Sequence, residues 1–464
     1  MRHLVAGALA ALLCFATTGA TAGAPTARAF ITSSGSSQVA VIDATTYGVS
    51  LVELGLMTHG VAVDPHGMRA YITTANGSKS AVYAVDVSSG RVVGSFDLTT
   101  LQFPGSSPFG IAVDSEGKRV YVTHAVRGRF GAVTVLNVSD SGGLSLVSTV
   151  EVLGTATGVV VSPYDKRVYV ANGVGRVSVI DPALVDTGKS PLVGTVWVGT
   201  ALTGIAASPN RSRIYVADTG GGMLWVVDTS RIGGESDPVL GGIPVGKAPF
   251  GVAVSADGKR IAVANSGDNT VSLIDGTTVP QGPDVTVKVG TGPHGVSFTS
   301  DGSRVFVANR FGDSVTVISS ATGAFLREIT LPRDTFPVAF GNFISPGLRT
   351  LTVQVDVKPG GNPNVINLKS RGTTPVAILG STGYDVTQVN IGTVRLAGAP
   401  VARKPNGAYM DSFDDVNGDG LIDLVLHFET AQMKLSPGDT QVTLEGEMTD
   451  GTPFSGTDSV KVVP

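Results

Sequence analysis

The sequence predicts an all-β fold, in which one four-stranded unit recurs along most of the chain and a different β domain follows it. Three observations lead to this prediction. The 464 residues include 61 glycines and 25 prolines, and only 15% are charged. Short runs rich in valine and threonine alternate with turn residues, as in strands joined by tight turns. These runs also repeat at a nearly constant spacing, which indicates a repeat architecture.

The clearest copy of the unit spans residues 248–275. Residues 251–254 form an apolar run of strand length, and Gly258 lies in a turn that needs a positive φ. Residues 261–264 form the return strand, and residues 270–275 alternate polar and apolar residues as a half-buried strand does. One copy cannot bury both of its faces, so several copies must pack together.

A glycine opens each copy and recurs at intervals of 44 to 50 residues. An apolar strand, a polar turn and a second strand ending in YVTH, YVAN or FVAN follow it, and then a third strand and a weaker fourth. A period of this length that holds four strands predicts the blades of a β-propeller. The opening glycines are Gly60, Gly110, Gly158, Gly204, Gly251 and Gly295.

The two ends of the repeat array complement each other. Residues 28–55 match a second, third and fourth strand without a first, and residues 337–344 match a first strand with nothing behind it. We therefore expect these ends to build a seventh blade together, which completes a propeller over residues 28–346. Closure of the ring would remove sheet edges that could pair with other chains.

The repeated second-strand endings and the DGKR-type turns before them resemble those of the YVTN-repeat β-propellers of surface-layer and other secreted or periplasmic proteins. The resemblance covers roughly residues 28–344 and implies a seven-bladed propeller. It implies no single function, because this fold carries many.

Residues 350–464 lack the repeat and contain seven or eight short apolar strands, which predict a β-sandwich-like domain. This segment resembles a recurrent C-terminal module of secreted bacterial proteins, with a KPG…INLKS…PVAIL opening and an aspartate-rich middle.

Residues 415–423, DVNGDGLID, form the strongest candidate metal site. Side-chain oxygens fall at loop positions 1, 3, 5 and 9, and a backbone carbonyl would serve at position 7, a spacing that curls a loop around one hard cation. The loop resembles the calcium loops of EF-hands and integrin-type repeats, although Leu426 stands where an EF-hand has its bidentate glutamate. Asp411, Asp414 or Glu429 could supply a further ligand, and an Asx-rich turn without metal is the alternative. The expected ligands of a structural calcium ion are Asp415, Asn417, Asp419, Leu421 and Asp423.

A second candidate site lies at one mouth of the predicted channel, where the first strands begin and the second strands end. His59, His124 and His294 could face a common funnel and bind a transition metal there. Because they come from different blades, we expect ordinary hydrogen-bonded histidines and no transition metal. Arg127, Arg129 and Arg310 could form a basic rim with Lys79 that holds an anionic ligand, or these charges could simply be solvated. Phe109 and Phe250 precede opening glycines at this mouth, and Phe336 is expected to hold the same place in the last copy. The other candidates are Asp218 and the three arginines of the rim.

The chain gives little support for catalysis. Lactonase-type propellers use acidic residues at the channel mouth, where this chain offers Asp218 and little else. Quinone-dependent propellers carry a repeated tryptophan signature, and this chain has only Trp197 and Trp225.

The N-terminus, residues 1–22, predicts a signal peptide. Arg2 and His3 precede an apolar run over residues 4–16, and an A-x-A cleavage site ends at Ala22. The single cysteine, Cys14, falls inside this segment, so the mature chain would have no disulfide and no thiolate chemistry. The net charge of −4 gives no basic footprint for nucleic acid, and no later stretch is long enough to cross a membrane. We expect an exported protein that is secreted, periplasmic or associated with the cell surface.

Together these features predict an exported, non-catalytic propeller that binds an extracellular protein, a surface polymer or a small anionic ligand, with a calcium-stabilised C-terminal module. One alternative is a propeller enzyme, a lactonase or a metal-dependent oxidoreductase, with its site at the channel mouth. Another is a structural cell-surface protein. A mouth filled by Phe109, Phe250 and Phe336 would favour a binding or structural role.

Overall fold

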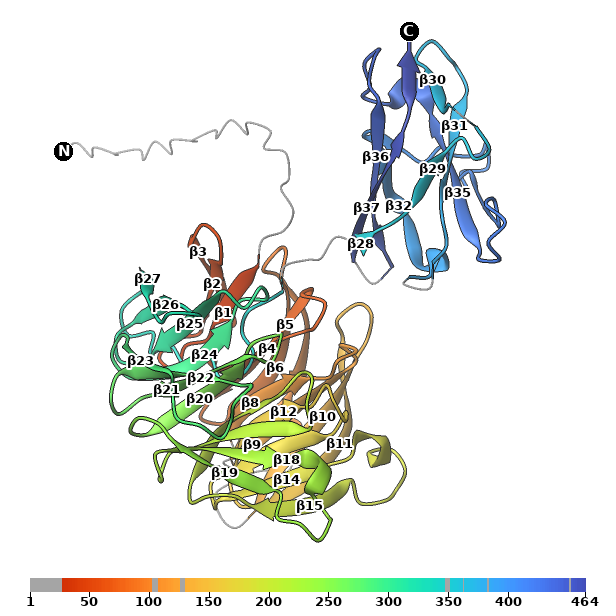
Figure 1. Cartoon of the computed structure of the whole chain (residues 1–464). Coiled ribbons are helices and arrows are strands. Elements are labelled where there is room, and N and C mark those ends of the chain that lie inside the picture. The colour runs from red at the N-terminus through yellow and green to blue at the C-terminus, as the bar shows by residue number, and fades with distance from the viewer. Residues whose placement is uncertain are drawn as a thin grey trace, which may run out of the picture.

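The computed structural model describes residues 27–101, 107–125, 130–346, 351–361, 363–381, 384–449 and 452–464. It confirms the all-β fold class (Figure 1). The predicted signal peptide lies outside these ranges. Within them, none of the helices has the length and apolar character needed to cross a membrane.

The propeller consists of six four-stranded antiparallel sheets and one three-stranded sheet. Each four-stranded sheet contains strands that are consecutive in the sequence, so each blade folds from one local segment. The first two blades are β4 (Met57–Val63), β5 (Arg69–Asn76), β6 (Lys79–Asp86) and β7 (Val92–Asp97), then β8 (Ser107–Val113), β9 (Arg119–Ala125), β10 (Phe130–Val138) and β11 (Leu144–Leu153). The next two are β12 (Ala156–Val161), β13 (Val168–Asn172), β14 (Arg176–Ile180) and β15 (Leu192–Trp197), then β16 (Leu202–Ala207), β17 (Arg213–Asp218), β18 (Met223–Asp228) and β19 (Val239–Pro244). The last two are β20 (Pro249–Val254), β21 (Arg260–Asn265), β22 (Thr270–Asp275) and β23 (Val285–Lys288), then β24 (Pro293–Phe298), β25 (Arg304–Asn309), β26 (Ser314–Ser319) and β27 (Phe325–Thr330). Three short 3₁₀ helices join strands of this part: η1 (Leu98–Thr100), η2 (Pro182–Leu184) and η3 (Thr229–Arg231).

The seventh blade is closed by both ends of the array, as the sequence predicts. Its sheet contains β1 (Arg28–Ile31), β2 (Gln38–Asp43) and β3 (Val49–Glu53). Residues 337–345, the closing segment, take the place of the missing inner strand: the amide of Phe30 donates to the carbonyl of Phe343 (2.8 Å). The closing segment also bonds to the first blade, because the amide of Val61 donates to the carbonyl of Phe340 (3.0 Å). It therefore joins the seventh blade to the first through backbone hydrogen bonds on both sides.

A direct steric requirement explains why each copy opens with a glycine. The inner strands of neighbouring blades approach so closely that a Cβ at Gly251 would collide with the carbonyl oxygen of His294 in the next blade. The other five opening glycines face the carbonyl of the next inner strand in the same way. Glycine allows this approach in the six blades that are complete in the sequence.

The propeller core lies between adjacent blades. One cluster, for example, packs Tyr71 and Val82 of the first blade against Ile111 and Leu136 of the second. The aromatic residue of the second strand is fully buried in six blades, where it fills the space between two sheets. These residues are Phe30, Tyr71, Tyr121, Tyr169, Tyr215 and Phe306.

The C-terminal residues form further β-sheets that share one hydrophobic core, in agreement with the sandwich-like prediction. A five-stranded sheet has the order β28 (Leu351–Thr352), β37 (Pro453–Ser459), β36 (Gln441–Met448), β32 (Val389–Leu396) and β33 (Ala399–Pro400). A four-stranded sheet has the order β29 (Val355–Val357), β31 (Thr373–Ile378), β35 (Asp423–Glu429) and β34 (Asp411–Asp414). The remaining elements are the parallel pair β30 (Val365–Asn367) and β38 (Lys461–Val463), with the 3₁₀ helices η4 (Val386–Gln388) and η5 (Thr430–Gln432).

Candidate functional site

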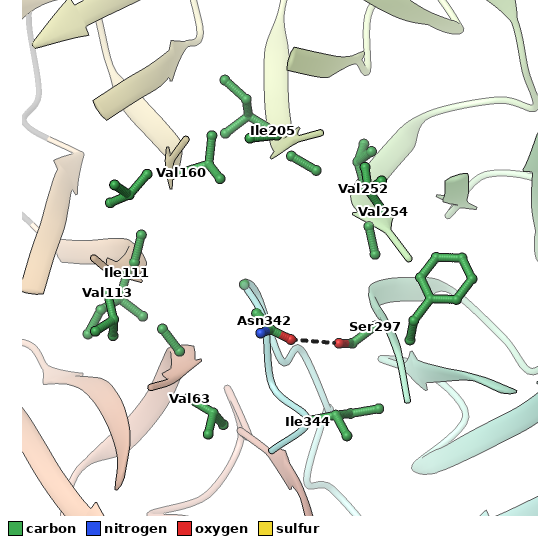
Figure 2. A pocket seen from close by; sticks show the side chains of 18 of the residues that line it. Val63, Ile111, Val113, Val160, Ile205, Val252, Val254, Ser297, Asn342 and Ile344 are labelled. Atoms are coloured by element: carbon green, nitrogen blue, oxygen red, sulfur yellow. Dashed lines mark hydrogen bonds between the residues drawn. The ribbon is translucent and has the colours of Figure 1, made fainter. Parts of the chain in front are cut away.

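A cavity of about 430 Å³ lies on the propeller axis (Figure 2). Its walls are the inner strands and the turns that follow them, so it occupies the end of the channel where the first strands finish. This is the face opposite to the mouth that the sequence singles out. Apolar side chains point inward from around the ring: Val63, Ile111, Val113, Val160, Ile205, Val252, Val254 and Ile344.

One hydrogen-bonded polar pair lies in the cavity wall. Ser297 on β24 donates a hydrogen bond from Oγ to Oδ1 of Asn342 in the closing segment, over 3.0 Å (Figure 2). Asn342 is exposed, and its side chain lies at the cavity. Sequence reasoning missed this pair, because neither residue belongs to a repeated position or a known motif.

Two carboxylates lie where the first strands end, Asp64 and Asp114. Both oxygens of Asp64 accept backbone hydrogen bonds, from Met68 (3.0 Å) and Arg69 (2.8 Å). Burial raises the pKa of Asp64, and these hydrogen bonds act against that rise. Ser255 accepts from the amide of Arg260 at the same place in another blade (2.9 Å). This position therefore caps the turn of a blade.

The opposite end of the cavity is closed by aromatic rings. Phe340 lines the cavity, and its ring packs against Phe109 (5.0 Å between centroids), Phe250 (5.6 Å) and His294 (6.2 Å). We call Phe109, Phe250, His294 and Phe340 the aromatic plug. It separates the cavity from the mouth where the first strands begin.

The structure corrects the place of Phe336 in this arrangement. The sequence equates Phe336 with the residue before each opening glycine, but Val338 holds that place: the amide of Ala339 donates to Oγ1 of Thr32 (2.9 Å), as the amide of Gly60 does to Thr73. The closing segment advances seven residues, from Pro337 to Ile344, between its bridges to Ser33 and Ala29. In the fifth blade, β20 advances only five residues, from Pro249 to Val254, against an equally long stretch of its partner strand. The two extra residues allow Phe340 to enter the channel. Phe336 is 36% exposed and binds Asp313 through its backbone amide (3.1 Å).

Two of the three candidate histidines lie near each other at the plugged mouth. His294 stacks on Phe250 with 3.6 Å between ring centroids and is 5% exposed. Burial and then the charge of Arg310 lower the pKa of His294 to about 3, although a hydrogen bond with the backbone of Val338 opposes them. Burial, and then the same arginine, also lower the pKa of His59.

The side chain of His124 makes its hydrogen bond within its own blade. Its Nε2 lies 2.8 Å from Oγ1 of Thr134 on the next strand, and burial lowers its pKa to about 4. In other blades an asparagine makes the same link, such as Asn172 to Ser178 (2.9 Å) and Asn265 to Ser272 (2.9 Å). His124 is thus one member of a repeated structural row. Across the described ranges, no three or more His, Cys, Asp or Glu side chains are gathered as a possible metal site.

Asp218 belongs to the same row. Its carboxylate accepts hydrogen bonds from the amides of Thr200 (3.0 Å) and Ala201 (2.9 Å) and from Nε1 of Trp225 (3.2 Å). Burial alone would raise the pKa of Asp218, but these hydrogen bonds outweigh it and hold the pKa below its usual value. The oxygens are occupied by the scaffold, which argues against a role as catalytic base.

Of the predicted basic rim, the structure describes Arg310 and Lys79, while Arg127 and Arg129 lie outside the described residues. The Arg310 guanidinium lies over the ring of Phe311, at 5.4 Å. Lys79 is exposed at the start of β6.

The loop of residues 415–423 is held by its own acidic side chains. Asp415 accepts from the amides of Gly418 (2.8 Å) and Gly420 (2.9 Å). Asp423 is buried and accepts from Gly380 (2.7 Å) and Val416 (2.9 Å). Asn417, Asp419 and Leu421 are exposed on the same loop. The donor set consists of oxygens, as calcium prefers, while in this structure those oxygens accept protein hydrogen bonds.

Comparisons with known proteins agree with the propeller architecture. The family model of the seven-bladed β-propeller lactonases matches residues 119–335. A protein from Lactobacillus plantarum is similar in structure, with 17% identity, a TM-score of 0.55 and coverage of 68% of this chain and 98% of that one. The periplasmic gluconolactonase of Pseudomonas aeruginosa has 18% identity, a TM-score of 0.53 and coverage of 68% and 98%.

The hydrazine synthase of Kuenenia stuttgartiensis has 20% identity, a TM-score of 0.51 and coverage of 67% of this chain and 99% of that one. No curated protein matches the chain in sequence. These likenesses establish the propeller fold of this chain, which is similar to the seven-bladed lactonases over residues 119–335.

Proposed function

We propose that this chain is an exported, non-catalytic binding protein whose propeller takes a small, largely apolar molecule into the axial cavity. The observation that carries the proposal is the cavity of about 430 Å³, walled by valine and isoleucine and closed at one end by the aromatic plug. Concave, mostly apolar sites with few polar groups are typical of small-molecule binding. Ser297 and Asn342 would orient the ligand by hydrogen bonds.

Two of the three acidic side chains described above at the ends of the channel, Asp64 and Asp218, have their oxygens held by the scaffold, which favours binding over catalysis. Asp64 caps a turn with both oxygens, and Asp218 holds a loop and a tryptophan. A general base needs a free oxygen directed at the substrate, and these two groups have scaffold partners.

The wider setting is part of the same proposal. The N-terminal segment with signal-peptide character and the YVTN-type repeat support export to the periplasm, the cell surface or the medium. Calcium bound by residues 415–423 would stabilise the C-terminal sheets, because a cation would neutralise the carboxylates clustered on one loop.

Binding of N-phenyl-1-naphthylamine, an uncharged apolar fluorophore, tests the cavity. Val252→Phe would fill the cavity from β20 and should weaken binding at least tenfold, and Val254→Phe should act in the same direction. Val193→Phe places the same ring on the outer strand β15, where Val193 is 45% exposed, and should leave binding unchanged. Absence of binding to the native protein, or equal binding by all variants, would overturn the proposal.

Lactone hydrolysis is the second candidate, and the match to the lactonase family model is the observation that favours it. Asp114 would be the base, because it lies at the cavity and its Oδ1 accepts from the amide of Lys118 (2.8 Å), which leaves Oδ2 for a water. If so, the protein should hydrolyse gluconolactone, and Asp114→Asn should lower the rate about 100-fold or more. Asp140→Asn, at an exposed ion pair with Lys118, is the control and should leave the rate unchanged.

A further inference from the structure

We propose that Arg310 and His59 form a binding site for a small organic carboxylate at the mouth of the channel opposite the axial cavity, beside the buried ring of His294. This site is separate from the cavity, because the aromatic plug lies between them. The inference does not depend on a ligand in the cavity.

The fold brings the three side chains together from two blades. His294 is the second residue of β24, and Arg310 directly follows β25, whose last residue, Asn309, pairs with Pro293. They therefore lie at the same end of neighbouring strands. His59, on β4, lies across the closing segment: its carbonyl accepts from Oγ1 of Thr32, which in turn accepts from the amide of Ala339.

The three groups lie close enough together for the charge of one to shift the pKa of another. The charge of Arg310 contributes to the lowered pKa of both His59 and His294, and His59 adds to the effect on His294. Both imidazoles are therefore neutral near pH 7, and Arg310 is the fixed positive charge of the group.

This positive charge has no acidic partner within the described ranges. None of the ion pairs found there involves Arg310, and its buried Nε has no hydrogen-bond partner. The carboxylate of Asp313, three residues along the chain, already accepts from the amides of Asp334 (2.9 Å) and Phe336 (3.1 Å). His294 offers this anion no donor, because its one N–H is bonded to the backbone of Val338 and its unpartnered Nδ1 carries a lone pair. An unpaired buried guanidinium N–H is costly, so Arg310 is complementary to an anion.

The surroundings select the kind of anion. The guanidinium can bind both oxygens of a carboxylate, and the neutral imidazole of His59 can donate one further hydrogen bond. Phe109 and Phe250 are only partly buried at this mouth, and Phe311 beneath Arg310 is 61% exposed. Their rings offer apolar contact to the body of a carboxylate, which an inorganic anion does not have.

Calorimetric titration of the full chain with benzoate, benzamide and inorganic phosphate tests the proposal. Benzoate should bind, whereas benzamide, which has the same shape without the charge, should not. Arg310→Gln should weaken benzoate binding about 10- to 100-fold, and Arg310→Lys should weaken it less because it keeps the charge. Arg327→Gln is the matched control, since Arg327 is on the outer strand β27, where its guanidinium lies over the ring of Tyr47.

Thermal unfolding of each variant confirms that the propeller is folded. The proposal is overturned if benzoate does not bind, or if Arg310→Gln and Arg327→Gln bind it equally. Phosphate binding as tight as that of benzoate would show a general anion site and would overturn the assignment to an organic carboxylate. A failed fluorophore experiment with normal benzoate binding would contradict the cavity proposal alone.

Discussion

The ring of Phe340 packs edge-on against the ring of Phe109, with 5.0 Å between centroids and an angle of 64° between the planes. Phe340 comes from the closing segment and Phe109 from the second blade, so one contact joins the closure of the ring to the end of the cavity. The same ring also meets Phe250 at 5.6 Å. The aromatic plug thus depends on a residue outside the repeated pattern.

Phe340→Ala should destabilise the propeller and open the plug. Phe340 is 6% exposed, and removal of a buried phenyl ring costs about 3–5 kcal/mol through lost contacts and the space left behind. Urea unfolding measures the loss. Phe336→Ala is the control, because Phe336 is 36% exposed and should cost about 1 kcal/mol or less. Equal losses for the two variants would contradict the assignment of Phe340 to the plug.

Gly251→Ala should lower the free energy of unfolding by about 2 kcal/mol or more, because the added Cβ would force two inner strands apart. Gly282→Ala provides the contrast. A Cβ at Gly282 meets no atom within 4 Å, and that substitution should be neutral or stabilise by about 0.5 kcal/mol. If Gly251→Ala unfolds at the same urea concentration as the native chain, the steric explanation of the repeated glycine is wrong.

His124 should make the propeller sensitive to acid. Its pKa in the folded state is about 4, below the ordinary value of 6.5, so the folded chain binds fewer protons than the unfolded chain between these values. The free energy of unfolding should be at its full value above pH 6.5 and fall as the pH drops toward 4, by up to about 1.4 kcal/mol per pH unit from this residue. His124→Asn introduces the residue that other blades use and should reduce this slope. Denaturant titrations at pH 7 and pH 4.5 compare the two proteins, and an unchanged slope would show that His124 is not responsible.

Calcium should slow amide hydrogen exchange in residues 411–429, and a chelator should reverse the effect. Asp419→Ala removes a ligand candidate and should abolish the calcium response. Asp385→Asn alters a carboxylate of the same domain that caps η4 through Thr387, and should keep the response. Mass spectrometry of the exchanged full chain gives the readout. Exchange rates that do not change with calcium would mean that the loop is held by its Asx turns alone.

The repeated features of the propeller could be predicted from the sequence because each has a local cause. The glycine of each copy, the strand after it and the turn before Arg260 recur in sequence, and the structure places them at equivalent positions. The pairing of residues 28–31 with residues 337–345 followed from the incomplete units at the two ends.

The open end of the channel could not be predicted in this way. Strand order shows which residues share an end of the propeller, but the end that is filled depends on the two extra residues that carry Phe340 into the channel. For the same reason Phe336 was assigned to a position that Val338 occupies. The orientation of the His124 side chain could not be predicted either, because a histidine at the end of a second strand can point to the channel or to Thr134.

The closing segment also has a consequence for the order of events during synthesis. The amide of Arg28 donates to Oγ of Ser345 across a separation of 317 residues (2.9 Å). A nascent chain that has not yet reached Ser345 can form single blades but cannot complete the ring, and contacts between such distant residues form slowly. We therefore expect the chain to remain an open array of blades until almost the whole propeller has been made.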